Sequence, residues 1–309
     1  KKNLSNIKKA INYLNNDDCI AIPTETVYGL AGNAYSDKAT SKIFKLKKRP
    51  KNNPLIVHYY NLSLLKKDCD VNKRFIKLYK KFCPGPVSFI LKLKKKSLIS
   101  RNVTNNKKTL AVRFPRHPLT RKLLSKLKYP LAAPSANIST KISAVKKEDV
   151  NEEFGKKIKF ILDGGKSKIG VESTIISLIE KPQILRLGGL EKNKLSKFLK
   201  INTQYVKKSK EILVPGQSKV HYSPEIPIRL NIKYPKQYEA FVLINKRKSS
   251  DKNYYYLSKN KNLREAAKNL YSVLRKIKKK RFKGIAVEKI PNLGFGETIN
   301  DRLIRASKF

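Results

Sequence analysis

The chain has 309 residues, 40% of them hydrophobic, which is enough for two domains of ordinary size with buried cores. Its 71 Lys and Arg against 22 Asp and Glu give a formal net charge of +49, a field that attracts polyanions in general without identifying one. The three cysteines form no C-x-x-C pair and have no histidine close to them in sequence, which argues against a zinc site or a disulfide framework.

We expect a soluble, cytoplasmic protein. No apolar run approaches the roughly 18 residues of a membrane span, and the basic start leads into an amphipathic pattern rather than a signal-peptide core. The lysine excess has two explanations that charge alone does not separate. Its spread from Lys1 to Lys308 is what an A- and T-rich genome would produce at solvated positions, whereas a dedicated nucleic-acid-binding face would also account for it.

Strands outnumber helices in the first part of the chain. Helical spacing predicts a first helix around Leu4 to Leu14, and Ser36 or Asp37 can cap a second helix that ends before Pro50. A further helix is predicted over residues 74–82. Several successive strands have no helix between them, which favours a twisted, mixed open sheet with flanking helices. The predicted strands are residues 19–22, 55–57, 87–93, 109–114, 131–133, 159–163, 173–178 and 184–187.

The apolar pattern lapses after residue 200 and then resumes. We therefore predict a first domain over 1–200, a linker or lid over 201–225 and a second domain over 226–309. In the second domain residues 240–245, 254–257 and 284–287 read as strands, and one helical face carries Leu263, Ala267, Leu270, Leu274 and Ile277. This alternation favours a small Rossmann-like domain, although it contains no G-x-G-x-x-G motif for a dinucleotide.

Polar residues cluster where the predicted strands end. Strand ends at one edge of an open sheet converge on a crevice, so these clusters can meet although they are scattered in sequence. Thr24, Thr26 and Tyr28 offer hydroxyl groups for a small polar substrate, Pro23 stops the strand, and Gly29 permits close backbone approach. GGKSK at 164–168 is not a P-loop, because Phe160 occupies the position of its first glycine.

Single clusters also have simpler explanations. His58 can be a structural histidine, and Asn137 can be present only because it tolerates a left-handed turn. Arg113 is more specific, since an arginine within the apolar TLAVRF would be partly buried and would need an anionic partner. That partner is either a protein carboxylate or the carboxylate or phosphate of a ligand.

As a set, the clusters resemble a known family. PTETVYGLAGNA, KKRPKNNPLIVH, PGPVSFIL, TLAVRFPRHP, LAAPSANIS, DGG with VESTII, and ILRLGG occur in the order found in YrdC-type threonylcarbamoyl-AMP synthases. This resemblance covers about Asn6 to Leu190. PGQSKVHYSP and the tail INDRLIRA resemble the two-domain branch of the family, which extends the similarity to nearly the whole chain.

The resemblance implies an enzyme that joins L-threonine, bicarbonate and ATP into L-threonylcarbamoyl-AMP and releases pyrophosphate. The product would feed N6-threonylcarbamoyladenosine modification of tRNA through a downstream threonylcarbamoyl transferase complex. The resemblance also implies a large positive cavity in the first domain, Mg²⁺ with the ATP, and a second domain packed across a linker. It leaves a transient contact with tRNA open and implies no membrane partner.

The family pattern also assigns site residues. Lys47 and Arg49 match its K-x-R element and are the expected catalytic cations. The expected ATP-binding residues are Arg49, Asn53, Thr109, Ser135, Asn137, Ser143, Arg186, His221 and Tyr222. The expected threonine-binding residues are Thr26, His58, Arg113, Ala133 and Ser173. Glu25 and Glu172 are candidates for a metal or supporting role, and no protein base is evident.

Some positions depart from the family pattern. Lys48 and Thr140 stand where the family has glycine, and Ser143-Ala144-Val145 replaces its S-P-T run. PGPVS replaces PGPVT. The path of the loop near Ser143 is therefore the least secure part of the ATP site.

Two other functions remain open from the sequence. A non-enzymatic RNA-binding or ribosome-associated module would use the positive charge, and its binding would weaken steeply with salt without needing Thr26, Arg113 or Ser173. Carbamoyl transfer in hydrogenase maturation would require zinc-ligand cysteine clusters and an acylphosphatase-like unit, and the chain has neither.

Overall fold

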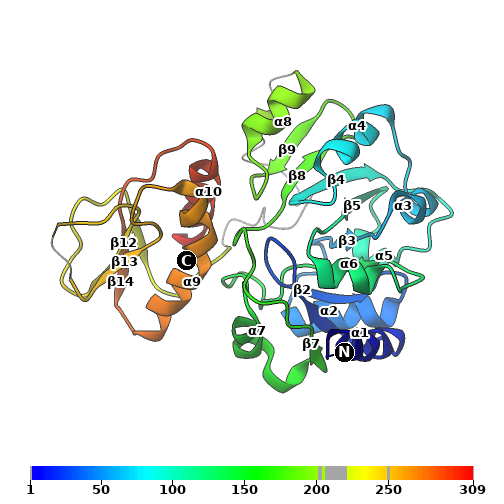
Figure 1. Cartoon of the computed structure of the whole chain (residues 1–309), viewed down its shortest axis with the longest axis horizontal. Coiled ribbons are helices and arrows are strands. Elements are labelled where there is room, and N and C mark those ends of the chain that lie inside the picture. Colours follow the sequence, from blue (N-terminus) through cyan, green and yellow to red (C-terminus); the bar gives the residue numbers. More distant parts are fainter. Residues whose placement is uncertain (1, 201–203, 206–220, 249–250, 309) are drawn as a thin grey trace.

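The computed structural model describes residues 2–200, 204–205, 221–248 and 251–308. Its strands form one 10-stranded mixed sheet and one 4-stranded parallel sheet, which confirms the predicted α/β class (Figure 1). Most of the predicted linker at 201–225 lies outside the described residues. The predicted domain limits at residues 200 and 225 therefore stay predictions.

The large sheet has the strand order β10-β9-β8-β4-β5-β3-β6-β2-β1-β7. Parallel and antiparallel pairs alternate from β10 to β3, three antiparallel pairs join β3, β6, β2 and β1, and β1 pairs in parallel with β7. Its strands are β1 (Ile20–Ile22), β2 (Gly29–Asn33), β3 (Ile56–His58), β4 (Val87–Lys92), β5 (Thr109–Arg113), β6 (Leu131–Ala132), β7 (Phe160–Ile161), β8 (Thr174–Ser177), β9 (Gln183–Arg186) and β10 (Gln204–Tyr205).

Strand β2 was not predicted from the sequence. Two glycines in GLAGN weaken the strand signal. The structure explains Gly32, because a Cβ atom there would lie 3.3 Å from Ile43 Cδ1 and 3.4 Å from Ala39 Cβ on helix α2. Close packing of a helix on the sheet thus selects glycine within a buried strand.

Helices cover the two faces of the large sheet unequally. Val57 of β3 packs into the main core with residues of α2, α3 and α4, whereas Ile56 faces the opposite side. On that opposite side α1 and α6 cover one end of the sheet. The helices of this domain are α1 (Lys2–Asn15), α2 (Asp37–Lys47), α3 (Leu62–Asp68), α4 (Lys73–Phe82), α5 (Arg101–Thr104), α6 (Pro118–Leu124), α7 (Lys147–Phe154) and α8 (Lys192–Leu199).

The small domain has the strand order β11-β14-β12-β13. Its elements are β11 (Ile228–Leu230), β12 (Glu239–Leu243), β13 (Tyr254–Tyr256), α9 (Leu263–Lys279), β14 (Gly284–Val287) and α10 (Phe295–Ala306). The predicted alternation of strand and helix holds from β13 onward. In the described residues no helix separates β11, β12 and β13.

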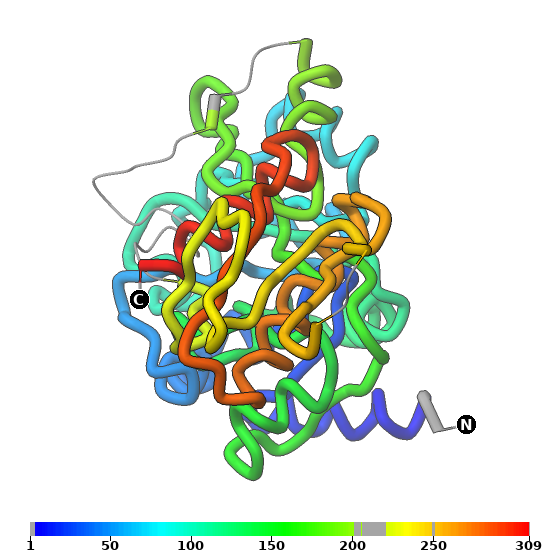
Figure 2. Tube along the Cα trace, turned by 90° about the vertical axis from the view of Figure 1, so that its left-hand side faces the viewer, coloured from blue at the N-terminus to red at the C-terminus, as the bar shows by residue number. Residues whose placement is uncertain are grey.

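Helices α9 and α10 lie between the small sheet and the large domain (Figures 1 and 2). Buried residues of both helices share one core with Val27, Ile142, Val145 and Val171 of the large domain. Part of the large domain's surface is therefore buried by the second domain.

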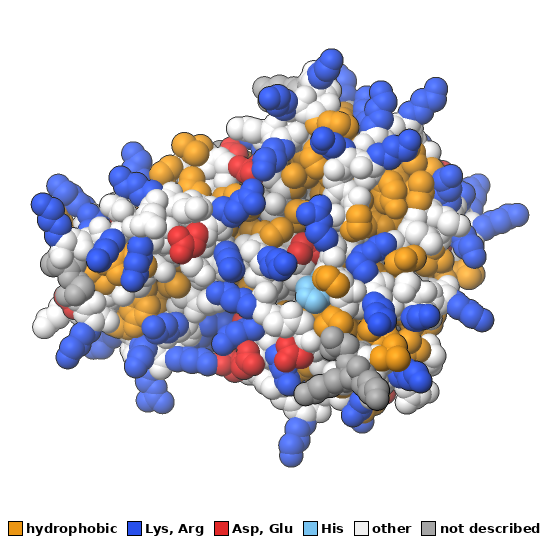
Figure 3. Space-filling model, viewed as in Figure 1, with side chains coloured by type: hydrophobic (Ala, Val, Ile, Leu, Met, Phe, Trp, Pro, Cys, Tyr) orange, Lys and Arg blue, Asp and Glu red, His pale blue; other side chains and the backbone are white. Residues whose placement is uncertain are grey.

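On the face shown in Figure 3 the positive charge is distributed rather than concentrated. Figure 3 shows Lys and Arg side chains scattered over both domains on the visible face, with few acidic ones among them. Among the described residues no helix combines the length and apolar character needed to cross a membrane.

Candidate active site

A cavity lies on the side of the large sheet that faces the second domain. It encloses about 500 Å³ not filled by protein atoms and is lined by strand ends, the loops that follow them and two residues that precede the second domain. The lining residues are Thr24, Val27, Tyr28, Gly29, Arg49, Ile56, His58, Arg113, Ala133, Pro134, Ser135, Glu172, Ser173, Arg186, His221 and Tyr222.

Nine of the residues expected from the sequence line this one cavity. They are Arg49, His58, Arg113, Ala133, Ser135, Ser173, Arg186, His221 and Tyr222. The expected residues that do not line it are Thr26, Lys47, Asn53, Thr109, Asn137 and Ser143.

Sheet register aligns one end of the cavity. His58 of β3 is the partner of Arg113 on β5, and Arg113 is also the partner of Ser88 on β4. Directly paired residues project to the same face of a sheet. Ser88 Oγ in turn lies 2.8 Å from Ser173 Oγ, so four polar side chains form a row across adjacent strands. Sequence reasoning did not include Ser88, because its relevance comes from the register.

Arg113 has a protein partner and also an unused donor. Its Nη2 donates to Glu25 Oε1 at 2.7 Å, and both side chains are buried. Burial opposes ionisation of Glu25, but Arg113 holds the pKa of that carboxyl below its ordinary value. Arg113 Nε is buried without a hydrogen-bond partner. The sequence left open a protein carboxylate or a ligand anion, and the protein carboxylate is Glu25, with one N–H still available.

His58 is neutral beside Arg113. Burial, reinforced by the Arg113 charge, holds the pKa of His58 well below its ordinary value. Its Nδ1 atom is buried without a hydrogen-bond partner. Two unsatisfied polar atoms on paired strands are a costly arrangement unless a ligand completes it.

Thr24, rather than Thr26, is the threonine that lines the cavity. Thr24 Oγ1 donates to the carbonyl of Val27 at 2.6 Å and lies 2.8 Å from Thr26 Oγ1. Because the Thr24 hydrogen is used on Val27, Thr26 is left as the donor to Thr24. Thr26, which is fully buried, therefore supports the lining residue.

Arg49 is a buried cation surrounded by neutral groups. It donates to the backbone and side-chain oxygens of Asn53 and to the carbonyl of Pro54. In the described part of the chain no carboxylate forms an ion pair with it. Burial, and then the nearby charge of Arg186, lowers the pKa of Arg49 to about 9. Asn53 thus orients Arg49 from behind the cavity wall.

Arg186 lies between the Arg49 region and the row of polar residues. Its Nε and Nη2 donate to the carbonyl of Ser173 at 3.1 and 2.9 Å, and Nη2 also reaches Ser173 Oγ at 3.1 Å. The guanidinium is therefore fixed over Ser173, at the junction of the two ends of the cavity.

Lys47 lies behind the wall of the cavity. It is 1% exposed, and its Nζ donates to the carbonyls of Ser135 and Asn137. Burial, and then the charge of Arg49, lowers the pKa of Lys47 well below its ordinary value. The Lys47 amino group holds the Ser135–Asn137 backbone in place through these two hydrogen bonds.

The second domain supports the cavity wall through Glu172. Tyr271 Oη donates to the Glu172 carboxylate at 2.9 Å, Arg302 Nε donates to Oε2 at 2.9 Å, and Ser143 Oγ donates to Oε1 at 2.6 Å. Although burial opposes it, Arg302 and then Arg186 lower the pKa of Glu172 to about 2. Sequence reasoning noted the tail INDRLIRA without a role for Arg302. The signal that could have identified Arg302 was its position on the apolar face of a C-terminal helix, where a buried arginine needs an acidic partner.

His221 and Tyr222 close the cavity on the side of the second domain. Both are buried, and the Arg302 guanidinium lies 4.7 Å from the centre of the Tyr222 ring. Burial lowers the pKa of His221 to about 3 and raises the pKa of Tyr222 to about 12, so both are neutral at ordinary pH. His221 Nδ1 and Tyr222 Oη are buried without hydrogen-bond partners.

Thr109 lies away from this cavity. It is at the start of β5, whereas Arg113 is at the end, and it lines a smaller hollow with Lys107 and Leu110. Another hollow, with about 940 Å³ not filled by protein atoms, shares Arg49 with the cavity and contains Lys45, Lys51 and Arg101.

Both glycine-to-side-chain departures lie at left-handed backbone positions. Lys48, the residue after α2, has φ +48°, and Thr140 has φ +71°. Glycine adopts this region without steric cost, whereas a β-branched threonine is strained there. The loop nevertheless closes, with Asn137 Nδ2 donating to the carbonyls of Ile138 and Lys141.

The carboxylates near the cavity do not form a metal site. Glu25 is bonded to Arg113 and to the backbone N–H of Arg116, and both oxygens of Glu172 are occupied as described above. In the described ranges no group of three or more His, Cys, Asp or Glu side chains is arranged to hold a metal ion. The donors present do not fit a protein-held Mg²⁺.

Comparisons with known proteins cover both domains. A family model of the Sua5, YciO and YrdC proteins, described as telomere recombination, matches residues 12–188. A second model, described as the C-terminal domain of threonylcarbamoyl-AMP synthase, matches residues 181–308.

Individual relatives agree with these matches. The threonylcarbamoyl-AMP synthase of Pyrococcus abyssi is 33% identical, over 98% of this chain and 94% of that protein. The threonylcarbamoyl-AMP synthase of Bacillus subtilis is also 33% identical, over 97% of this chain and 92% of that protein. The crystal structure of P. abyssi Sua5 complexed with L-threonine has a TM-score of 0.90 and 31% identity, covering 98% of this chain and 94% of that one.

Proposed function

The chain belongs to the Sua5, YciO and YrdC family and carries the C-terminal domain of its threonylcarbamoyl-AMP synthases, and we propose from this premise that its buried cavity holds L-threonine beside ATP. The chain is a threonylcarbamoyl-AMP synthase that uses L-threonine. It forms L-threonylcarbamoyl-AMP in the first step of N6-threonylcarbamoyladenosine modification of tRNA. ATP, bicarbonate and the downstream transferase belong to the proposal.

The row of polar side chains across β3, β5 and β4 forms the end of the cavity that binds threonine. The α-carboxylate of threonine binds the free Nε–H of Arg113, while Glu25 holds the same guanidinium from its other side. Neutral His58 and the hydroxyl of Ser173 face the same space and complement the amine and hydroxyl of the amino acid. The unsatisfied atoms on His58 and Arg113 support this placement.

The environment of Arg49 is the main support for placing the nucleotide at this end of the cavity. A buried guanidinium with only neutral partners is unfavourable unless an anion joins it. The neighbouring Arg186 adds a second cation at the same cavity. A phosphate group between Arg49 and Arg186 would compensate the charge of Arg49, and Ser135 and Tyr222 line the adjoining wall.

This placement gives the residues distinct tasks in the reaction. Threonine's deprotonated amine adds to carbon dioxide formed from bicarbonate, giving a carbamate. A carbamate oxygen then attacks the α-phosphorus of ATP, and the bond to the pyrophosphate leaving group breaks. Arg49 and Arg186 stabilise negative charge on the phosphate oxygens, and Arg113 fixes the carboxylate so that the amine points toward that phosphorus. Mg²⁺ enters this proposal only with ATP, as the counter-ion of its phosphates.

The test is pyrophosphate release from ATP with L-threonine and bicarbonate together and with each omitted. We expect release only when all three substrates are present. Arg113→Ala should reduce the threonine-dependent rate by about a thousandfold, because it removes a charge-assisted contact and leaves Glu25 buried and unpaired. Arg74→Ala, which changes an exposed arginine on α4, is the control and should keep the parental rate.

Two results would contradict the proposal. Pyrophosphate release that does not depend on threonine would exclude the reaction, and full activity of Arg113→Ala would exclude the threonine assignment. Equilibrium binding of L-threonine to Arg113→Ala separates lost binding from lost chemistry.

A further inference from the structure

Residues 137–145 form a loop behind the cavity wall, called here the backing loop. The N–H of Tyr28, a lining residue, donates to the carbonyl of Ala144 at 2.8 Å. Ser143 Oγ donates to Glu172, and Lys47 links the carbonyl of Asn137 to that of Ser135. Lining residues at three places on the wall therefore depend on the position of this loop.

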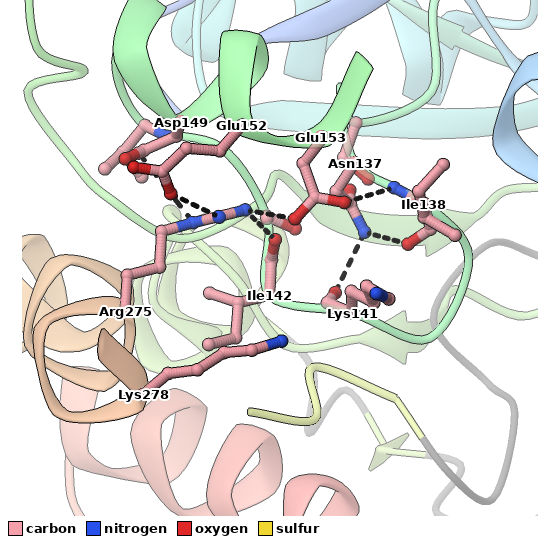
Figure 4. Close-up of polar contacts among 12 residues, drawn as sticks. Asn137, Ile138, Lys141, Ile142, Asp149, Glu152, Glu153, Arg275 and Lys278 are labelled. Carbon is pink, nitrogen blue, oxygen red and sulfur yellow. Dashed lines mark hydrogen bonds and ion pairs between the residues drawn. The ribbon is translucent and has the colours of Figure 1, made fainter. Parts of the chain in front are cut away.

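Arg275 of the second domain holds the backing loop directly. It projects from α9 and is 8% exposed. Its Nη2 donates to the carbonyl of Ile142 at 2.6 Å and to Glu153 Oε1 at 2.9 Å (Figure 4). One side chain thus binds both the loop and helix α7 across the domain boundary.

Glu153 extends the hold to the start of the loop. Its second oxygen, Oε2, accepts a hydrogen bond from the N–H of Ile138 at 3.0 Å. The neighbouring Asn137 side chain closes the turn through the carbonyls of Ile138 and Lys141 (Figure 4). Arg275 therefore fixes Ile142 directly and Ile138 through Glu153.

The charges around Arg275 are unusual for this chain. Only 22 of its 309 residues are acidic, yet Asp149, Glu152 and Glu153 of α7 all lie within 4.0 Å of the Arg275 guanidinium. An arginine can donate in several directions from one rigid plane, whereas a lysine cannot reproduce that geometry. The arrangement requires an arginine rather than any cation.

We propose that Arg275 is a positioning residue for the nucleotide end of the cavity: by fixing the backing loop it makes that end depend on docking of the second domain. The nucleotide part of this inference rests on the proposed function. Arg275 does not line the cavity, so its effect passes through the loop to Ser135, Tyr28 and Glu172. His58 and Arg113 of the threonine end stand on β3 and β5, away from the loop's hydrogen bonds to Glu172, Tyr28 and Lys47, so the threonine end should be affected less.

The experiment compares Arg275→Met, Arg275→Lys and Lys279→Met in the full chain. Lys279 is the matched control, because it also forms an ion pair between the domains, with Glu152, but is exposed and does not contact the backing loop. Hydrogen exchange of backbone amides is measured in the free proteins, and binding of ATP and of L-threonine is measured separately.

We expect Arg275→Met to speed hydrogen exchange at two backbone amides: that of Ser139, which donates to the carbonyl of Lys47, and that of Tyr28, which donates to the carbonyl of Ala144. Exchange in β4 and β5 should not become faster. ATP affinity should fall by about tenfold and threonine affinity by less than about twofold. Lys279→Met should match the parent, and Arg275→Lys should lie between the two.

Unchanged exchange in the backing loop of Arg275→Met would overturn the inference. Faster exchange throughout the large domain with equal loss of both ligands would reduce Arg275 to a general stabilising residue, which also overturns it. If Arg275→Met does not fold, the same criteria apply to Arg275→Lys. If the parent chain does not bind ATP, the proposed function fails, and the exchange result still decides whether Arg275 positions the loop.

Discussion

At the scale of single residues, burial determines the charge state of the cavity. His58 and His221 are both buried among cations, and burial lowers the pKa of each. Arg49 remains a buried cation in this cavity, and the two histidines stay neutral. The cavity is therefore positive because of its arginines, independently of histidine protonation.

This charge state makes stability depend on pH. His221 binds a proton near pH 6.5 when unfolded but only near pH 3 when folded, so below pH 6.5 the unfolded chain holds more protons. Stability must then fall on acidification, and between about pH 7 and about pH 5 His221 alone should cost about 2 kcal/mol of unfolding free energy. Glu172, with its lowered pKa, adds a loss of the same sign at lower pH.

Urea unfolding of the parent chain and of His221→Gln over this pH range measures the effect. The unfolding free energy of the variant should fall less steeply with decreasing pH, and the two slopes should differ by the contribution of about one bound proton. Equal slopes for the two proteins would show that His221 is not buried in its neutral form.

At the scale of elements, the two positions where the chain has a side chain and the family has glycine share one backbone geometry. Lys48 after α2 and Thr140 in the backing loop both adopt left-handed backbone angles. A side chain there costs about 1 to 2 kcal/mol relative to glycine, which is partly offset because glycine loses more entropy on folding.

Thr140→Gly should therefore raise the free energy of unfolding by about 0.5 to 1 kcal/mol, measured by urea denaturation. Ser139→Gly is the matched control. Ser139 has no left-handed angle, so its replacement should lower stability by a similar amount. If both variants are destabilised, Thr140 is not strained as described.

The elements also show how far sequence reasoning reached. Apolar runs predicted β1, β4, β5, β8 and α9 to within a few residues, since each packs one regular face into a core. Strand β2 was missed because two glycines weaken its strand signal, and one of them, Gly32, is explained only by tertiary packing against α2. The role of Ser88 was missed because it depends on strand register, which a single sequence does not contain.

At the scale of the whole molecule, the second domain supports a site whose lining lies in the first domain and at His221 and Tyr222. The hydrogen bond from Arg302 to Glu172 joins residues 130 positions apart in the chain, and the contacts of Tyr271 with Glu172 and of Arg275 with Ile142 span 99 and 133 positions. No local sequence pattern predicts such contacts. The sequence therefore indicated a second domain but not that this domain supports the cavity wall. The resemblance to a family gave nine of the sixteen lining residues, whereas the supporting roles of Tyr271, Arg275 and Arg302 came from the structure.

The most direct test of this account is a structure of the chain with L-threonine and a non-hydrolysable ATP analogue bound together. The account predicts the threonine carboxylate on Arg113 Nε, with His58 and Ser173 around the amino acid, and a phosphate group between Arg49 and Arg186 in the same cavity. Threonine bound elsewhere, or a nucleotide whose phosphates contact neither Arg49 nor Arg186, would contradict it.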